Sequence, residues 1–254
     1  MRKVSCLMAT FLAFSSVACE RQGQGAQADD AKPRPAAKLP DLKPGVHQQE
    51  LKYDNGTLRY TISIPKDGAK KSAAPLIIAL HYGGEVTPFY GRGMIDSLVG
   101  PAFAELGAII IAPDSLGGDW TQSKNEQAVL FLIDSACASY NIDAKKVLLT
   151  GFSMGGIGTW FIAGRHQDRF SAAIPIAGGP PAREVKWEIP LYVIHSRADT
   201  VLRLEPTRQY VDQAKAKGAN IELVILDGIT HYDTGRFAKP LKEAVPWIKK
   251  VWKK

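Results

Sequence analysis

The fold is decided by Lys146-Val-Leu-Leu-Thr-Gly-Phe-Ser-Met-Gly-Gly-Ile-Gly-Thr-Trp160. The stretch opens with an apolar run that is typical of a buried strand and continues into helix-compatible residues. Between them, Gly151-Phe-Ser-Met-Gly155 is a G-x-S-x-G motif at a strand-to-helix turn, the arrangement of a nucleophile elbow. The turn is strained, so the glycines supply the room that flanking side chains would occupy. The pattern predicts Ser153 at the end of a sheet, with the Met154 amide at a helix N-terminus, where the dipole favours negative charge.

Strands and helices alternate on both sides of this stretch, which predicts right-handed crossovers and a mostly parallel sheet flanked by helices. An antiparallel hairpin precedes them, because two strands with period-two alternation flank the turn Asp54-Asn55-Gly56. Its strands are expected at 51–53 and 58–64, and the buried strands at 75–80, 108–112, 147–150, 172–176, 191–194 and 221–226. Helices are expected at about 94–106, 126–140, 155–165, 206–217 and 239–252.

The chain before this domain predicts export from a bacterial cytoplasm. Residues 1–18 have a basic start, an apolar stretch and small residues before Cys19, as a signal peptide does. The ending Ser16-Val-Ala-Cys19 fits lipidation of Cys19, which would anchor the protein to a membrane, and also fits plain cleavage into the periplasm or medium. Residues 19–45 are rich in Gln, Ala, Pro and Lys without apolar periodicity, so we expect a disordered tether before a catalytic domain at 46–254.

Composition excludes several partner classes. The net charge of +7 reflects scattered lysines rather than a helical stripe of arginines and aromatics, so we expect no nucleic-acid partner. The chain contains no H-E-x-x-H, paired C-x-x-C or P-loop motif, so neither a metal nor another cofactor is expected. Cys137 belongs to an apolar helical stripe, which places it in the core.

Ser153 needs a base to take its proton and an acid to orient that base. Each partner is expected just beyond a later strand, in the order serine, acid, histidine. Asp199 follows the strand at 191–194 and His231 follows the strand at 221–226, so we assign them as acid and base. His195 is interpreted as a packed residue beneath the acid loop. Asp227 and Asp233 flank the His231 loop and are interpreted as structural or salt-bridged.

An oxyanion formed on the substrate needs amide donors. Met154 supplies the first, and the loop His81-Tyr-Gly-Gly84 supplies the second, from Gly83 or alternatively Tyr82. His81 is expected to support this loop. Three aromatic residues are candidates for a substrate pocket: Trp120, Tyr82 and Tyr232. For Trp120 a role in covering the core is an equal alternative.

Taken together, His81-Tyr-Gly-Gly, Gly151-Phe-Ser-Met-Gly-Gly, His195-Ser-Arg-Ala-Asp and Thr230-His231 resemble motifs of the α/β-hydrolase superfamily. The resemblance covers about residues 50–253 and is greatest to the lidless carboxylesterase/phospholipase group and the feruloyl-esterase and polyhydroxybutyrate-depolymerase-like group. It implies an α/β-hydrolase fold and a serine esterase. Two departures are His-Tyr-Gly-Gly, where relatives tend to have His-Gly, and Ser196, where glycine is common. Only about a dozen residues separate the strands at 172–176 and 191–194, where lids are often inserted, so we expect little or no lid.

Three functions follow as hypotheses. The first is a secreted serine hydrolase that cleaves small-molecule or polymer-linked carboxylic esters through an acyl-Ser153 intermediate. The second is a serine peptidase of the oligopeptidase-like branch, which shares the three residues. The third is a hydrolase-fold binding protein without activity. Membrane association is expected only through the N-terminal lipid.

Overall fold

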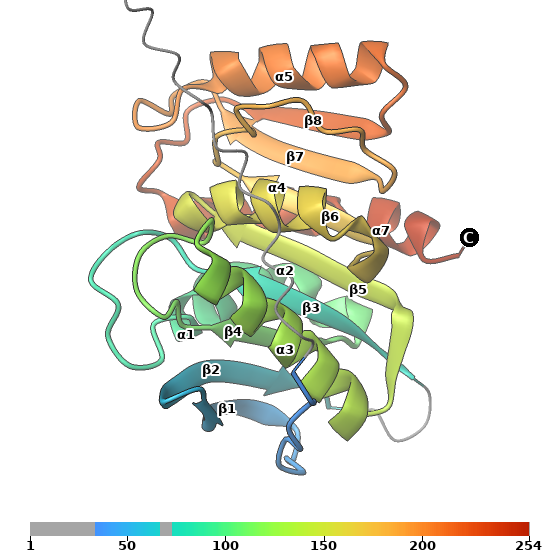
Figure 1. Cartoon of the computed structure of the whole chain (residues 1–254). Coiled ribbons are helices and arrows are strands. Elements are labelled where there is room, and N and C mark those ends of the chain that lie inside the picture. The colour runs from blue at the N-terminus through green and yellow to red at the C-terminus, as the bar shows by residue number, and fades with distance from the viewer. Residues whose placement is uncertain (1–33, 67–72, 254) are drawn as a thin grey trace, which may run out of the picture. The chain divides into compact units, whose positions relative to one another are not determined.

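The computed structural model describes residues 34–66 and 73–253, and within these ranges eight strands form one sheet in the order β1-β2-β4-β3-β5-β6-β7-β8 (Figure 1). The hairpin β1–β2 is antiparallel, β2 pairs antiparallel with β4, and all further pairs are parallel. The strands are β1 (Gly45–Tyr53), β2 (Gly56–Ile64), β3 (Ala74–Leu80), β4 (Ile109–Pro113), β5 (Ile142–Phe152), β6 (Ala172–Ile176), β7 (Leu191–Ser196) and β8 (Ile221–Leu226). The predicted alternation and the leading hairpin are confirmed.

The central strand β6 contains a proline, which is unusual because proline cannot donate to the ladder. Pro175 pairs in register with Gly151 of β5. On the other side, β6 and β7 are in register at Ala173 and Ile176. The missing donor is thus accommodated where the β6–β7 ladder is sparse.

Helices cover both faces of the sheet. The helices α3 (Ser123–Ser139), α4 (Met154–Arg165) and α5 (Leu204–Ala216) contribute to one apolar cluster. The other cluster includes residues of α1 (Arg92–Met94), α2 (Gly100–Phe103), α6 (Ala238–Glu243) and α7 (Val245–Val251). In Figure 1, α3 and α4 lie in front of the sheet and α2 and α7 behind it. None of the helices in the described ranges is both long enough and apolar enough to cross a membrane.

Two expected helices are interrupted, each near a proline. A π-helical turn, Ile95–Val99, and a 3-10 turn, Ala104–Leu106, flank α2, which has Pro101 in its first turn. The expected C-terminal helix is divided into α6 and α7, and Pro246 lies at the start of α7. Proline fits the first turn of a helix, where its missing N–H has no intrahelical acceptor.

The prediction of a disordered tether is wrong for residues 34–44. This segment has no helix or strand, but Leu39 is 3% exposed and belongs to a core cluster. The N–H groups of Ala37 and Leu39 donate to Ser135 Oγ (3.0 Å) and Ser139 Oγ (2.7 Å) on α3. This segment has no apolar periodicity. It is ordered by hydrogen bonds from its backbone N–H groups to side chains about 100 residues away in the sequence. Residues 1–33, which carry the predicted signal peptide and Cys19, lie outside the described residues.

The prediction for Cys137 is also wrong, because its side chain is exposed. Val129, Ile133 and Ala136 on the same helix are buried as expected. At about 100° per residue, position 137 lies roughly 70° around the helix from the centre of that stripe. It therefore lies on the flank of the helix.

Candidate active site

Ser153 lies at the turn between β5 and α4. Its φ of 55° and ψ of −115° are rarely adopted by residues other than glycine. Two glycines make the turn sterically feasible. A Cβ on Gly151 would overlap the carbonyl group of Gly155, and a Cβ on Gly155 would overlap the carbonyl group of Leu80. The turn thus depends on close backbone packing, and it presents the half-buried Ser153 at the carboxyl end of the sheet.

The structure brings Ser153, His231 and Asp199 together in one hydrogen-bonded chain. The Nδ1 of His231 lies 2.6 Å from Oδ2 of Asp199, and its Nε2 lies 2.7 Å from Oγ of Ser153. A carboxylate only accepts, so Nδ1 carries the proton, and the unprotonated Nε2 accepts from the serine hydroxyl. Asp199 and His231 are 3% and 6% exposed. The loops that carry them follow β7 and β8 and lie at the left-hand edge of the sheet in Figure 1.

The acid loop is held by its own hydrogen bonds. Oδ1 of Asp199 accepts from the N–H groups of Val201 (2.9 Å) and Leu202 (2.8 Å). Beneath the loop, Nε2 of the buried His195 lies 2.6 Å from the Leu202 carbonyl oxygen, to which it donates. Burial lowers the pKa of His195, although the Leu202 carbonyl and the Asp199 carboxylate oppose this shift. We therefore treat its 3.7 Å approach to Asp199 as a contact of a neutral ring and not as an ion pair.

Two further residues tie the base loop in place, and their roles are not evident from motif spacing. The hydroxyl of Ser196 donates to the Ile229 carbonyl at 2.6 Å, which joins the end of β7 to the loop of His231. Oδ2 of Asp233 accepts from both the N–H and the hydroxyl of Thr230 at 2.7 Å. Two sequence features could have indicated these roles. One is Ser196 at a position where glycine is common, and the other is Asp233 three residues after Thr230.

His81 connects the loop after β3 to the loop after β4. Its Nδ1 donates to the Tyr82 carbonyl (2.7 Å), and its Nε2 accepts from the Ser115 N–H (3.0 Å). The side chain is fully buried, and burial lowers its pKa. This neutral tautomer fits the supporting role that the sequence suggested.

The loop that His81 supports approaches the helix start of the Ser153 turn. A Cβ on Gly83 would lie 3.9 Å from the Cβ of Met154, so the two candidate oxyanion donors belong to adjoining backbone. Tyr82 is half-buried, and its ring contacts those of Tyr90 and Phe152, at centroid distances of 5.5 and 6.3 Å. Gly83 and Tyr82 both remain candidates for the second donor.

The aromatic pocket candidates separate in the structure. Tyr232 is 83% exposed, and its ring centroid lies 5.9 Å from that of His231. Trp120 is 1% exposed, and its indole N–H donates to the His81 carbonyl at 2.9 Å. The pocket role proposed for Trp120 is therefore wrong, and its role in covering the core is correct. The indole packs against α4 where Gly158 leaves space, since a Cβ there would overlap the tryptophan side chain.

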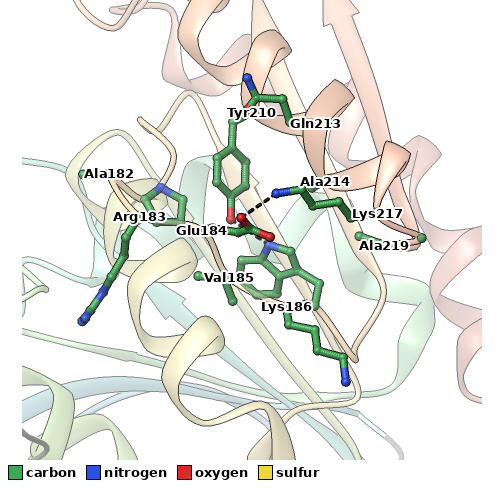
Figure 2. A pocket seen from close by; sticks show the side chains of 13 residues that line it. Ala182, Arg183, Glu184, Val185, Lys186, Tyr210, Gln213, Ala214, Lys217 and Ala219 are labelled. Atoms are coloured by element: carbon green, nitrogen blue, oxygen red, sulfur yellow. Dashed lines mark hydrogen bonds and ion pairs between the residues drawn. The ribbon is translucent and has the colours of Figure 1, made fainter.

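Residues 178–190 join β6 to β7 and form no helix or strand. They pack against α4 and α5. A cavity of about 290 Å³ lies between this segment and α5 (Figure 2). Glu184 and Lys217 form an ion pair of 2.5 Å at its wall, and Trp187 donates to the Tyr210 hydroxyl at 2.9 Å. The lining includes none of the hydrogen-bonded chain of Ser153.

Comparison with known proteins finds similarity to hydrolases. The model of the dienelactone hydrolase family matches residues 117–243, half of the chain. Probable feruloyl esterase C of Aspergillus terreus is 30% identical over 146 residues, which cover 56% of this chain and 52% of that protein. Poly(3-hydroxyalkanoate) depolymerase C of Paucimonas lemoignei is 38% identical over 64 residues, 25% of this chain and 16% of the depolymerase. The chain thus spans about half the length of the feruloyl esterase and less of the depolymerase.

Among solved structures, a thermostable esterase superposes with a TM-score of 0.69 at 24% identity, covering 81% of this chain and 62% of that one. This similarity shows that the fold is that of the α/β hydrolases, as expected from the motifs. The expected similarity to feruloyl esterases and polyhydroxyalkanoate depolymerases is likewise confirmed.

Proposed function

The chain belongs to the dienelactone hydrolase family, and from this premise we propose that it is a serine hydrolase that cleaves carboxylic esters through an acyl-Ser153 intermediate. The observation that supports the proposal most strongly is the continuous hydrogen-bonded chain from Ser153 through His231 to the buried Asp199. The similarity to a probable feruloyl esterase and to a poly(3-hydroxyalkanoate) depolymerase supports the choice of ester substrates. Both small-molecule and polymer-linked esters are included in the proposal.

In the first half of the reaction, Ser153 Oγ attacks the ester carbonyl carbon while its proton passes to His231 Nε2. Asp199 stabilises the resulting imidazolium through the hydrogen bond to Nδ1. The carbonyl oxygen becomes an oxyanion, which we assign to the N–H of Met154 and the N–H of Gly83 or Tyr82. Collapse of the tetrahedral intermediate breaks the bond to the alcohol, and His231 returns the proton to the leaving oxygen.

In the second half, water replaces the alcohol. His231 Nε2 takes a proton from the water as it attacks the acyl carbon, and the second tetrahedral intermediate releases the acid. Ser153 regains its proton from His231, so the enzyme returns to its starting state. None of these steps uses a metal or a cofactor.

We further propose export from a bacterial cytoplasm with lipidation of Cys19 after removal of residues 1–18. The support is the basic start, apolar stretch and small residues before the cysteine. Growth of cells with an alkyne fatty acid, followed by fluorophore coupling, tests this. Label on the wild-type chain but not on Cys19→Ala supports the anchor, and export without label indicates plain cleavage.

The experiment that tests the catalytic proposal is labelling of the mature protein by a fluorophosphonate, beside turnover of short and aromatic p-nitrophenyl esters. Ser153→Ala is expected to abolish labelling and to lower kcat by about a thousandfold or more. Ser123→Ala, an exposed serine on α3, is the matched control and should label like the wild type. Labelling that persists in Ser153→Ala would refute the assignment.

Two outcomes lead to the alternative hypotheses. Labelling at Ser153 without ester turnover would favour a serine peptidase, to be tested with aminoacyl p-nitroanilides. A folded protein that neither labels nor turns over any substrate would favour an inactive binding protein on this fold.

A further inference from the structure

Three large apolar side chains are exposed in the part of the chain that the structure describes: Val46, Val201 and Tyr232. Two of them lie beside the hydrogen-bonded chain of Ser153. Val201 follows Asp199 by two positions, and Tyr232 directly follows His231. Single exposed apolar side chains are ordinary on a protein surface, so the exposure alone needs no explanation. The position of these two, next to the acid and the base, indicates contact with the substrate.

Tyr232 lies on the solvent side of the catalytic histidine. The His231 ring contacts two aromatic rings, those of Phe152 and Tyr232, at centroid distances of 5.4 and 5.9 Å. Phe152 is 2% exposed and supports the imidazole from the core, whereas Tyr232 is 83% exposed. The Tyr232 ring stands at 84° to the imidazole, an edge-to-face arrangement. The imidazole is therefore supported from inside, and the outer ring keeps most of its surface free for a ligand.

Val201 is held in place by the acid. Its N–H donates to Oδ1 of Asp199 at 2.9 Å, and its side chain remains 48% exposed. The other carboxylate oxygen of Asp199 lies 2.6 Å from His231 Nδ1. The loop of Val201 and the loop of Tyr232 thus meet at the bond between acid and base, and each loop brings an exposed apolar side chain.

The charged side chains of the base loop already have partners. Asp227 forms an ion pair of 3.0 Å with Arg197 of the acid loop. Asp233 accepts from Thr230 and lies 3.7 Å from Arg236. A charged ligand group would have to compete with these contacts, whereas a neutral apolar group has the Tyr232 ring available. The surface next to His231 therefore favours a neutral, apolar part of the substrate.

The chemistry of the proposed reaction decides which part of the ester lies there. His231 Nε2 must give its proton to the oxygen of the leaving alcohol, so that oxygen lies within hydrogen-bond reach of Nε2. The carbonyl oxygen points instead to the N–H of Met154 and the second oxyanion donor. An exposed ring in contact with the imidazole is therefore placed beside the alcohol part of the ester and not beside the oxyanion.

We propose that Tyr232, together with Val201, contacts the alcohol part of the ester and selects esters of neutral alcohols that carry an apolar ring. The inference rests on the proposed function, to which it adds specificity for one side of the ester bond. A ring on the alcohol would pack against Tyr232 and remove apolar surface of both groups from water. The same ring on the acyl group would lie on the other side of the carbonyl carbon and would miss this contact.

The first test uses two isomeric esters. Benzyl acetate carries a phenyl ring on the alcohol, and methyl phenylacetate carries it on the acyl group. We expect Tyr232→Ala to lower the ratio of kcat/KM for benzyl acetate to kcat/KM for methyl phenylacetate by about fivefold, mainly through KM. Val201→Ala should lower the ratio less. Tyr232→Phe keeps the ring and should keep the ratio.

Val46→Ala is the matched control, because it also removes an exposed apolar side chain. Val46 pairs with Ser63 of β2, and Ser63 pairs with Ile110 near the start of β4. Val46 thus lies at the opposite edge of the sheet from the loops after β7 and β8, and the variant should leave the ratio unchanged.

A second test measures the alcohol side by itself. With methyl acetate as the acyl donor, benzyl alcohol competes with water for acetyl-Ser153. The alcohol oxygen attacks the acyl carbon as its proton passes to His231 Nε2. Collapse releases benzyl acetate, and the proton returns to Ser153 Oγ. Both products come from one intermediate, so the ratio of benzyl acetate to acetic acid does not depend on the acylation step. Tyr232→Ala should lower this ratio, and Val46→Ala should not.

The outcomes separate this inference from the proposed function. An active Tyr232→Ala enzyme with both ratios unchanged would overturn the inference. A loss confined to methyl phenylacetate would place the ring on the acyl side and would also overturn it. An equal loss for the two isomers, with unchanged partition between alcohol and water, would show that Tyr232 only supports His231. If the wild-type protein cleaves neither isomer and Ser153 does not label, the proposed function fails and this inference fails with it.

Discussion

The serine turn and the loops of the acid and base are positioned by different forces. The turn at Ser153 is fixed by contacts between backbones that only glycine permits, at Gly151 and Gly155. The loops of Asp199 and His231 are instead held by hydrogen bonds that the side chains of His195 and Ser196 donate and that the Asp233 carboxylate accepts. One part of the site thus depends on the absence of side chains, and the other depends on their presence.

This difference has a consequence for how the site tolerates change. A side chain added at the turn overlaps backbone atoms, which cannot move aside as the end of a flexible side chain can. When a hydrogen bond of the acid or base loop is lost, the loop can still form, but its catalytic side chain is displaced. Substitutions at the turn should therefore affect folding itself. Substitutions around the loops should affect activity more than stability.

The largest expected effect follows from Gly155→Ala. Its Cβ would overlap the carbonyl group of Leu80 and approach the His81 carbonyl oxygen, both in the strand end and loop next to the turn. Overpacking typically costs about 1–3 kcal/mol, and we expect at least 3 kcal/mol here because only backbone atoms are available to move. Urea unfolding followed by circular dichroism measures the change in free energy.

Gly56→Ala is the matched control, because a Cβ there meets its nearest atom at an ordinary 3.8 Å. It should change stability by less than about 1 kcal/mol. If Gly155→Ala were as stable as Gly56→Ala, close backbone packing would not be what holds the turn.

The next effect is expected from His195→Phe, which keeps a ring but removes the donor to the Leu202 carbonyl. A loop that shifts Asp199 should orient His231 less well, and we expect kcat/KM to fall about tenfold, equal to ~1.4 kcal/mol in the transition state. Steady-state kinetics with a p-nitrophenyl ester measures it. His195→Gln retains an N–H donor and should recover part of the loss. Equal activity in both variants would show that the contact does not position the acid.

The same contrast explains what the sequence predicted well. The Ser153 turn was located because its requirement, two glycines between a strand and a helix, lies within five residues. The positions of Asp199 and His231 followed from strand ends, since parallel strands bring their carboxyl ends to one edge. The catalytic roles of all three remain predictions that the labelling experiment tests.

Two of the failed predictions depend on contacts between distant segments. Residues 34–44 dock because Ser135 and Ser139 on α3 accept their N–H groups, and no local pattern reveals this. Trp120 is buried because the His81 carbonyl satisfies its indole N–H, across 39 positions of sequence. In each case a polar group finds a partner that only the folded chain provides.

A smaller effect is expected from Asp233→Ala, which leaves the N–H and hydroxyl of Thr230 without their acceptor. Both Thr230 groups would then have only water as acceptor, so the variant should unfold at a lower urea concentration than the wild type. Since Thr230 precedes His231, the variant should also lower kcat. Asp227→Ala, whose carboxylate lies in an exposed ion pair with Arg197, is the control and should lose less stability than Asp233→Ala. Indistinguishable variants would show that the base loop does not need this hydrogen bond.

The smallest effect concerns pH. It tests whether His195 supports the acid loop as a neutral ring or as a charged one. Burial lowers the pKa of His195 below its ordinary 6.5, so the folded protein binds a proton there less readily than the unfolded chain. Below about pH 6.5 the unfolded chain takes up this proton, and stability falls as pH falls; above it this contribution is flat. Thermal unfolding from pH 7.5 to 5.5 should therefore show a shallower decline for His195→Gln than for the wild type. Parallel declines would mean that the ring takes up a proton in the folded state, and the acid loop would then be held by an ion pair with Asp199 in place of a neutral hydrogen bond.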